Sequence, residues 1–421
     1  MARPWRPTRR RIWCSRRFVC WAGTCCRTGR SDGSRRRGER YRGSRACGGW
    51  VKKLRWHSKF GPIAVEEPQY RRLNERLRPF REEAKIRLRG CSRPLQRAIV
   101  DFAADQPFAQ ARAKLLEHYG VGIGESTIQR VTFEHAGAMR RSERPRAAFP
   151  DKPGRHKTIV AQTDGGMIPV VETDRRQKDR RKGKTLLWKE AKLALARAHG
   201  SRTPVYAAMI GGGVDKAGAQ LFDCAVRAGF GVDSRVHAVG DGAAWIVGQI
   251  EERFGVQGRY LVDFYHVCEY LAEASGAVHA DPAERTRWVE AQKQALRSGR
   301  AQAVLSALAA HVEPPTRADE EAPARRCHRY LAARRDQLFY DEALAAELPI
   351  GSGEIESAHR YVAQQRLKRP GAWWKVEHAE DMLALRVLRI NGDWEKYWSE
   401  QRASAAQANH NRPEASEARA A

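Results

Sequence analysis

The spacing of hydrophobic positions changes along the chain, from helical to strand-like and back to helical. Leu95, Ile99 and Phe102 recur three or four residues apart, which predicts a helix in the first part. The middle of the chain has short apolar runs such as 205–210 and 235–239, which have the length of buried strands. We therefore expect an α/β protein flanked by helical segments.

The strand-like runs and the helical stretches between them follow a definite order. Strands are predicted at 158–163, 167–172, 205–210, 235–239 and 260–264, and helices at 217–228 and 243–254. Three strands followed by helix, strand, helix and strand is the order of a ribonuclease-H-like core, in which carboxylates project from neighbouring strand ends. Residues 267–345 lack strand patterning and are rich in Ala, Arg and Glu, which predicts a helical insertion.

These patterns divide the chain into six segments. They are a basic arm at 1–56, a helical DNA-binding domain at 66–144, the first part of the catalytic core at 156–266, the insertion at 267–345, C-terminal core helices at 346–398 and a disordered tail at 399–421. A linker rich in Pro, Arg and Lys precedes the core and marks a domain boundary.

A helix-turn-helix is predicted within residues 66–144. One helical stretch ends at Gly120, and Ser126 with Gln129 three residues later has the form of a capping box that begins the next helix. This second helix carries Gln129 and Arg130, side chains that suit a major groove. A helical hairpin that only packs has the same sequence pattern, so both interpretations remain open.

The next motif, Asp164-Gly165-Gly166, lies between two apolar runs and predicts a hairpin turn. A basic loop is predicted at 174–192, and its cations suit the phosphates of a nucleic acid. The candidate DNA-binding residues of this loop are Arg175, Arg176, Lys178, Arg180, Arg181, Lys182 and Lys184.

Composition adds a strong positive charge, with a formal net charge of +28. Residues 1–56 carry 18 Lys and Arg against 2 Asp and Glu, so more than half of the net charge lies there. Two interpretations of this segment remain open: a disordered arm that binds phosphates, or a misassigned start codon. It has cysteines but no Cys-x2-Cys pair, so a structural zinc site is not favoured.

Several classes of protein are not expected. The chain has no apolar run of eighteen residues, which argues against a membrane span, and no apolar signal-peptide core follows its basic start. Its cysteines are scattered, which favours reduced thiols over a disulfide framework. We expect a cytoplasmic protein.

Three acids stand at the ends of apolar runs or beside glycine: Asp164, Asp241 and Glu356. Each also suits a turn or the first turn of a helix, and taken singly that simpler interpretation is favoured. Together, in a chain of strong positive charge, they suit the binding of two Mg2+ ions, with Mn2+ as a substitute. Such ions can activate the attacking oxygen and stabilise the leaving oxygen of a phosphoryl transfer.

Five motifs occur together in order along residues 60–398. They are Thr163-Asp164-Gly165-Gly166, Trp188-Lys189-Glu190, Gly240-Asp241-Gly242-Ala243 with Trp245-Ile246, Asp263-Phe264-Tyr265-His266 and Ile350-Gly351-Ser352-Gly353-Glu354-Ile355-Glu356-Ser357. This set resembles the signatures of DDE transposases from bacterial insertion sequences, with the ISKra-type branch most similar. The resemblance implies that Asp164, Asp241 and Glu356 are the catalytic, magnesium-binding acids, and that a ribonuclease-H-like fold carries a helical insertion.

Two assignments within that resemblance involve a choice. Glu354 and Glu356 point about 200° apart on a helix, so only one can face the site, and the family pattern favours Glu356. Asp263 is the rival of Asp241 for the second acid, but the resemblance makes Asp263 and His266 supporting residues. A neutral core histidine is an equal interpretation of His266.

The function predicted is DNA transposition: nicking at transposon ends and transfer of the 3′-hydroxyl into target DNA. By analogy we expect a homo-oligomer on DNA in the bacterial nucleoid, with further contacts from Arg366 and Lys368. Two alternatives stay open, a structure-selective nuclease that cuts without joining and a non-catalytic DNA-binding protein derived from a transposase.

Overall fold

The computed structural model describes residues 47–72, 75–78, 90–142, 148–174, 176 and 183–401. The chain forms two compact units. Within the described part, the first unit contains residues up to Arg97 together with Leu115–Gly122, and the second contains Ala98–Lys114 and the residues from Ile123 onward. Residues 1–46 and 402–421 lie outside the description, so most of the predicted arm and tail stays a prediction.

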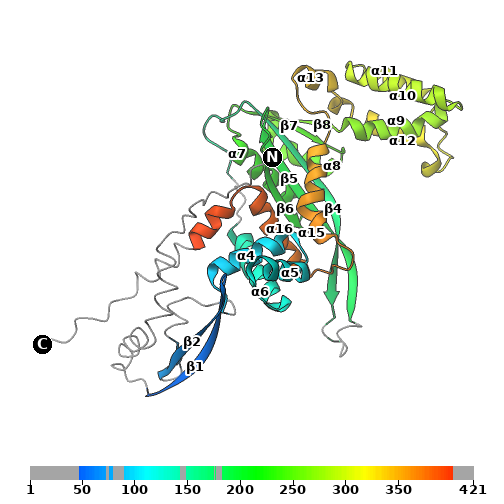
Figure 1. Ribbon diagram of the computed structural model, residues 1–421. Helices are drawn as coiled ribbons and strands as arrows, with labels where there is room; N and C mark the ends of the chain where they lie inside the picture. The colour runs from blue at the N-terminus through cyan, green and yellow to red at the C-terminus, as the bar shows by residue number, and fades with distance from the viewer. Residues whose placement is uncertain are drawn as a thin grey trace, which may run out of the picture. The chain divides into compact units, whose positions relative to one another are not determined.

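The first unit holds a three-stranded antiparallel sheet. Its strands are β1 (Cys47–Ser58), β2 (Gly61–Arg72) and β3 (Glu75–Leu77), drawn in blue in Figure 1. The predictions of a strandless arm up to residue 56 and of helices from residue 66 are wrong here. The sheet pairs Lys52 with Glu67 and Lys53 with Glu66, so opposite charges across strands stabilise a segment that looks polar and unpatterned in sequence.

Three helices follow at the positions where the sequence predicts them. They are α4 (Arg93–Asp105), α5 (Phe108–Tyr119) and α6 (Glu125–Ser142). Gly120, with φ of +61°, follows α5 in the left-handed conformation that favours glycine. The predicted capping role of Ser126 is wrong, because α6 already begins at Glu125 and the amide of Ile128 donates to the carbonyl of Gly124 at 3.2 Å.

The second unit is built on a five-stranded mixed sheet in the order β6-β5-β4-β7-β8. The strands are β4 (Thr158–Thr173), β5 (Lys184–Ala198), β6 (Val205–Ile210), β7 (Arg235–Gly240) and β8 (Gly258–Val262). β5 is antiparallel to both of its neighbours, whereas β7 and β8 run parallel to β4. The α/β class predicted from the sequence is confirmed.

The predicted hairpin turn at Asp164-Gly165-Gly166 is wrong. These residues lie inside β4, which pairs without interruption with β5, for example Asp164 with Leu193. The hairpin is instead formed by β4 and β5, so part of the predicted loop at 174–192 is strand from Lys184 onward. Asp-Gly favours a turn locally, but continuous pairing with β5 satisfies the backbone of this segment.

Helices cover both faces of the sheet. α7 (Val214–Ala228) and α8 (Ala244–Phe254) pack against the face that carries Ile159 and Ala161, which we call the α7/α8 face. On the opposite α14 face lie α14 (Gly353–Ala358) and α16 (Val376–Ile390), and α6 packs on α16. Between α14 and α16 are a π-helix (His359–Gln364) and α15 (Gln365–Leu367).

The segment after β8 is helical, as predicted for residues 267–345. It comprises α9 (Phe264–Val278), α10 (Pro282–Arg297), α11 (Ala301–Ala309), α12 (Pro323–Ala332) and α13 (Tyr340–Ala345). Single 3-10 turns lie at Asp319–Glu321 and Arg335–Gln337. A further 3-10 turn, Gly255–Gln257, precedes β8. Buried Leu271, Leu296, Leu308 and Leu331 form its core. No helix of the described residues has the length and apolar character needed to cross a bilayer. Cys91, Cys224, Cys268 and Cys327 are free thiols, as predicted.

Candidate functional site

Sheet register brings the first two predicted acids together. β4 and β7 are parallel neighbours, and Ala161 pairs with Ala238. Asp164 lies three residues after Ala161, and Asp241 lies three residues after Ala238. If the register is continued, the two acids lie at the same level of the sheet. Side chains alternate along β4, so Asp164 lies on the α14 face, opposite to Ala161, and Asp241 directly follows the end of β7.

Asp164 occupies a half-buried position in which its charge is disfavoured. Burial raises the pKa of its carboxyl group, and the nearby carboxylates of Asp241 and Glu356 raise this pKa further. His359 and the amide of Gly165, which donates to Asp164 Oδ1 at 2.7 Å, act in the opposite direction. Asp241 and Glu356 therefore both lie within electrostatic range of Asp164.

Asp241 is exposed directly after β7, and its neighbours in the chain are firmly held. Its Oδ1 accepts a hydrogen bond from the Ala243 amide at 2.9 Å, and its main-chain oxygen accepts one from the Tyr330 hydroxyl at 2.6 Å. Gly242 has φ of +84°, and a Cβ atom there would lie 2.5 Å from Arg334 Nε. Glycine is therefore required after Asp241, and the backbone that presents the acid is fixed from the helical segment.

Asp263, at the end of β8, is 3 % exposed and has a different role. Its Oδ1 caps α9 by accepting from the amides of Tyr265 and His266, at 2.6 and 3.2 Å. Its Oδ2 accepts from the Ser352 amide at 2.6 Å and from the Ser352 hydroxyl. Both oxygens are thus occupied within the protein, and Asp263 joins the start of α9 to the loop that leads into α14.

Glu356 is exposed in the first turn of α14, and Ser352 connects it to Asp263. The Ser352 hydroxyl, which donates to Asp263, also lies 3.3 Å from Glu356 Oε1. Glu354 points elsewhere: Arg197 on β5 binds it with Nε–Oε1 and Nε–Oε2 distances of 2.9 and 3.0 Å. This arrangement favours Glu356 over Glu354 as the acid of the site.

Gln162 holds α14 against β4, and the sequence analysis did not single it out. It is 1 % exposed, lies two residues before Asp164 and so shares the α14 face. Its Oε1 accepts from the Ile355 amide at 3.0 Å, and its Nε2 donates to the Gly351 oxygen at 3.4 Å. The alternation of side chains along β4 would have placed Gln162 on the same face as Asp164. The hairpin turn predicted at Asp164 interrupted that alternation.

His359 is the second residue that the sequence did not reveal. It lies three residues after Glu356 and is 4 % exposed, with Nε2 3.1 Å from the Asp164 main-chain oxygen and 3.6 Å from Asp164 Oδ2. A Cβ atom on Gly166 would lie 2.8 Å from His359 Nδ1, so glycine lets the imidazole lie against the strand. The ring therefore contacts Asp164 from the π-helix that directly follows α14.

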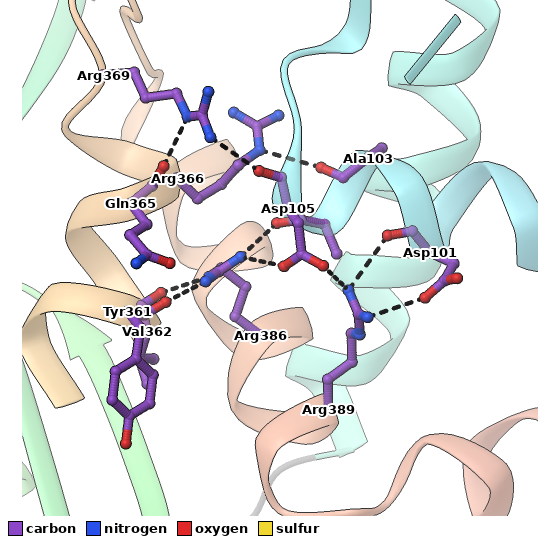
Figure 2. A network of polar contacts seen from close by, with 11 residues as sticks. Asp101, Ala103, Asp105, Tyr361, Val362, Gln365, Arg366, Arg369, Arg386 and Arg389 are labelled. Carbon is purple, nitrogen blue, oxygen red and sulfur yellow. Dashed lines mark hydrogen bonds and ion pairs between the residues drawn. The ribbon is translucent and has the colours of Figure 1, made fainter. Parts of the chain in front are cut away.

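The helical segment after Glu356 is anchored by arginines (Figure 2). Arg366, Arg369, Arg386 and Arg389 donate to the main-chain oxygens of Ala103, Asp105, Ala104 and Asp101, respectively, at the C-terminal turn of α4. Positive charge is favourable at a helix C-terminus, where carbonyls lack partners within the helix. Arg386 Nε also donates to the Val362 oxygen in the π-helix at 2.7 Å.

The predicted DNA-binding residues fall into three groups. Gln129, Arg130, Arg176, Lys184 and Lys368 are exposed and can meet a ligand. Arg366 is 2 % exposed between the rings of Phe108 and Trp374, and burial lowers its pKa to about 10, so the prediction that it contacts DNA does not fit its position. Arg175, Lys178, Arg180, Arg181 and Lys182 lie outside the described residues.

His266 lies beside the aromatic pair that supports Asp241. Its ring centroid is 5.3 Å from that of Tyr270 and 5.9 Å from that of Tyr330, and its Nδ1 is 3.4 Å from Glu269. Tyr330 is the residue that donates to the main chain of Asp241. A role of His266 in supporting the second acid would therefore be exerted through Tyr330.

The donor chemistry of the three acids suits a hard divalent cation. Mg2+ in proteins is usually bound by carboxylate oxygens. The negative charges of Asp241 and Glu356 raise the pKa of Asp164, and a bound cation would offset them. Within the described residues, no three His, Cys, Asp or Glu side chains are already close enough to hold a metal ion. Asp241 and Glu356 are exposed, so both carboxylates are accessible from solvent.

A family profile matches the C-terminal part of the chain. The profile of a family described as "Uncharacterised protein family (UPF0236)" matches residues 231–402, which include Asp241, Asp263 and Glu356 but not Asp164. No curated protein matches the chain. The family description names no activity, so the site geometry carries the functional argument.

Proposed function

We propose that the chain is a DNA transposase of the DDE type, which nicks DNA at transposon ends and transfers the 3′-hydroxyl into target DNA. The observation that carries the proposal is that Asp241 and Glu356, although more than 70 residues from their neighbouring acid in the chain, both lie near enough to Asp164 to raise its pKa. Isolated carboxylates gathered in a chain of net charge +28 suit phosphoryl transfer on a polyanion.

The sheet topology supports a ribonuclease-H-like interpretation of the core. Numbered by their order in this unit, the strands run 3-2-1-4-5, with the second antiparallel to the others. The first acid lies on the central strand, the second follows its parallel neighbour, and the third comes from a helix against the same face. On this interpretation, helices α9 to α13 form the insertion between the second and third acids.

Asp164, Asp241 and Glu356 would bind the two Mg2+ ions, for which Mn2+ could substitute. Bound there, the ions would lower the pKa of the attacking hydroxyl and offset the charge of the leaving oxygen. The protein's own contribution is positioning: Gln162 and Asp263 hold the start of α14, and His359 contacts Asp164 from the same helical segment.

DNA would be held by basic side chains outside the acid group. Gln129 and Arg130 are exposed on α6, which supports a helix-turn-helix role for α5 and α6. Arg176, Lys184 and Lys368 add exposed positive charge. Two ends must be joined to one target, so we expect a homo-oligomer on DNA and, in the cell, association with the nucleoid.

The test is a strand-joining assay with pre-cut ends, a target plasmid and Mg2+. We expect the wild-type protein to join the strands and Glu356→Gln to abolish joining. Glu354→Gln is the matched control, because it changes the same chemistry two residues away on α14 and should leave joining nearly unchanged. Joining that survives Asp164→Asn would exclude the acid assignment.

The same assay separates the alternatives. Metal-dependent cutting without joined product would identify a structure-selective nuclease. Binding to DNA with neither cutting nor joining in Mg2+ or Mn2+ would identify a non-catalytic DNA-binding protein.

A further inference from the structure

One face of the β4–β5 hairpin carries large apolar side chains in contact with solvent. Met167, Leu186, Trp188 and Trp373 are 46, 48, 52 and 57 % exposed. Together with Lys184 and Lys368 they form what we call the Trp188 surface. Single exposed apolar residues are ordinary, but a group of this kind on one face marks an interaction site.

The strand register places the hairpin members of this group in one row. Trp188 pairs with Pro169 and Leu186 pairs with Val171, each two positions from the next, so with Met167 they share the α7/α8 face. Figure 1 shows β4 and β5 extending well beyond the short strands β7 and β8. Ile159 and Ala161, earlier on this face, are buried beneath the helices, whereas the side chains of Met167, Leu186 and Trp188 reach solvent.

Trp373 joins the row from the other side of β4. Its neighbour Trp374 forms a bridge with Val170, and the Trp374 oxygen accepts from the Val171 amide at 2.7 Å. Trp374 is 5 % exposed, on the face where Val170 is buried, so the adjacent Trp373 side chain points to the opposite, open face.

Both exposed indoles are accompanied by lysines. Lys368 Nζ lies 5.6 Å from the ring centroid of Trp188, and Lys184 Nζ lies 5.8 Å from that of Trp373. The acid in the same row, Glu190, is already paired with Lys192. The surface is therefore aromatic and positively charged, with its nearest row carboxylate neutralised.

These features favour an unpaired nucleic-acid strand over the other occupants of an apolar surface. Proteins that bind single strands combine a basic track with aromatic side chains on which bases stack, a contact that tolerates any sequence. A second copy of this chain would bring its own positive charge, since residues 57–421 carry 59 Lys and Arg against 47 Asp and Glu.

We propose that the Trp188 surface binds an unpaired DNA strand by stacking bases on Trp188 and Trp373. The identity of this strand as DNA rests on the proposed function. Trp188 shares its face with Pro169, whereas Asp164 lies on the opposite α14 face, so binding at the Trp188 surface can be measured separately from chemistry at the acids.

The test measures binding of a fluorescent 12-nucleotide single strand by anisotropy, using the full chain. We expect Trp188→Thr and Trp373→Ala each to weaken binding by about tenfold, with Trp188→Phe restoring most of the affinity because a ring remains. Phe60→Ala is the matched control, since Phe60 is 90 % exposed in the first unit and its loss should leave affinity unchanged.

Two further measurements identify stacking as the cause. Abasic oligonucleotides should bind the wild-type protein more weakly than the intact strand, whereas the double variant Trp188→Thr with Trp373→Ala should bind both strands equally. Lys184→Gln should reduce the salt dependence of binding, whereas the tryptophan variants should keep it. Thermal melting of each variant verifies folding, and Trp188→Phe provides a fold-preserving comparison.

Unchanged affinity in both tryptophan variants would overturn the proposal. A loss of self-association on sedimentation, with no change in oligonucleotide binding, would overturn it in favour of a second copy as the occupant. These outcomes are distinct from a failure of the transposase assignment, because oligonucleotide binding is measured without any strand joining.

Discussion

The ends of two adjacent parallel strands carry the same residue in opposite circumstances. Asp241 follows β7 and is exposed, and its carboxylate accepts one hydrogen bond from its own turn. Asp263 follows β8 and is buried, and its two oxygens accept from α9 and from Ser352. By sequence the two are rivals for one role, since each ends a strand and precedes a helix.

The difference lies in how much of each carboxylate is already used. An acid whose oxygens are all hydrogen-bonded within the protein stabilises the fold and has little capacity left for a ligand. One with free oxygens near other carboxylates can bind a cation. Glu354 and Glu356 repeat this contrast two residues apart, since Arg197 pairs with Glu354 and not with Glu356.

The largest expected effect is on strand joining. Asp241→Asn should reduce the rate by about a thousandfold or more, since loss of a metal ligand removes several kcal/mol of transition-state stabilisation. Asp263→Asn keeps the acceptor that caps α9 and should stay within about tenfold of wild type. The measurement is single-turnover joining, normalised to folded protein, and the reverse ranking would make Asp263 the second acid.

The next effect is on stability, where Asp263 should matter more than Asp241. Asp263→Ala should lower the free energy of unfolding by about 3 kcal/mol, because a helix cap is lost and the buried Ser352 amide is left without its acceptor. Asp241→Ala should change it by less than about 1 kcal/mol, as expected of an exposed side chain. Chemical denaturation of both variants checks this; equal losses would contradict the contrast.

Ser352 tests whether the structural acid supports the site. Ser352→Ala should slow joining by about tenfold, as is usual when a residue that orients a ligand is lost, and Ser352→Thr should restore most of the rate because it keeps the hydroxyl. The readout is the joining rate against Mg2+ concentration. A change in stability without a shift in the Mg2+ dependence would limit Ser352 to a packing role.

The smallest effect concerns Asp164 and pH. The raised pKa of Asp164 means that the folded protein favours its protonated carboxyl group over the charged one. The protonated group therefore stabilises the fold at low pH, and this stabilisation is lost as the pH rises through the raised pKa. Asp164→Asn should therefore raise Tm by about 1 °C at neutral pH, a small amount because solvent screens the charge. Below about pH 4 the substitution should leave Tm unchanged. Mg2+ should raise the Tm of wild type but not of this variant; an equal Mg2+ response would argue against Asp164 as a ligand.

Much of the secondary structure could be predicted because it depends on local spacing. The helices from α9 to α13 and α16 follow the period of their apolar residues, and α5 ends before Gly120 because glycine tolerates the left-handed conformation. The three acids were identifiable because each stands out against short apolar runs. β1 and β2 were missed because their pairing relies on opposite charges across strands, which no local period reveals.

The sequence by itself determined the α/β class, most of the helices and the positions of the candidate acids. Only the tertiary structure decided that Asp164 lies within a strand, that Arg366 is buried and that Asp263 is occupied by Ser352, which is 89 residues away. The physical reason is that local spacing sets helix and strand, whereas the use of each polar atom depends on partners distant in the chain.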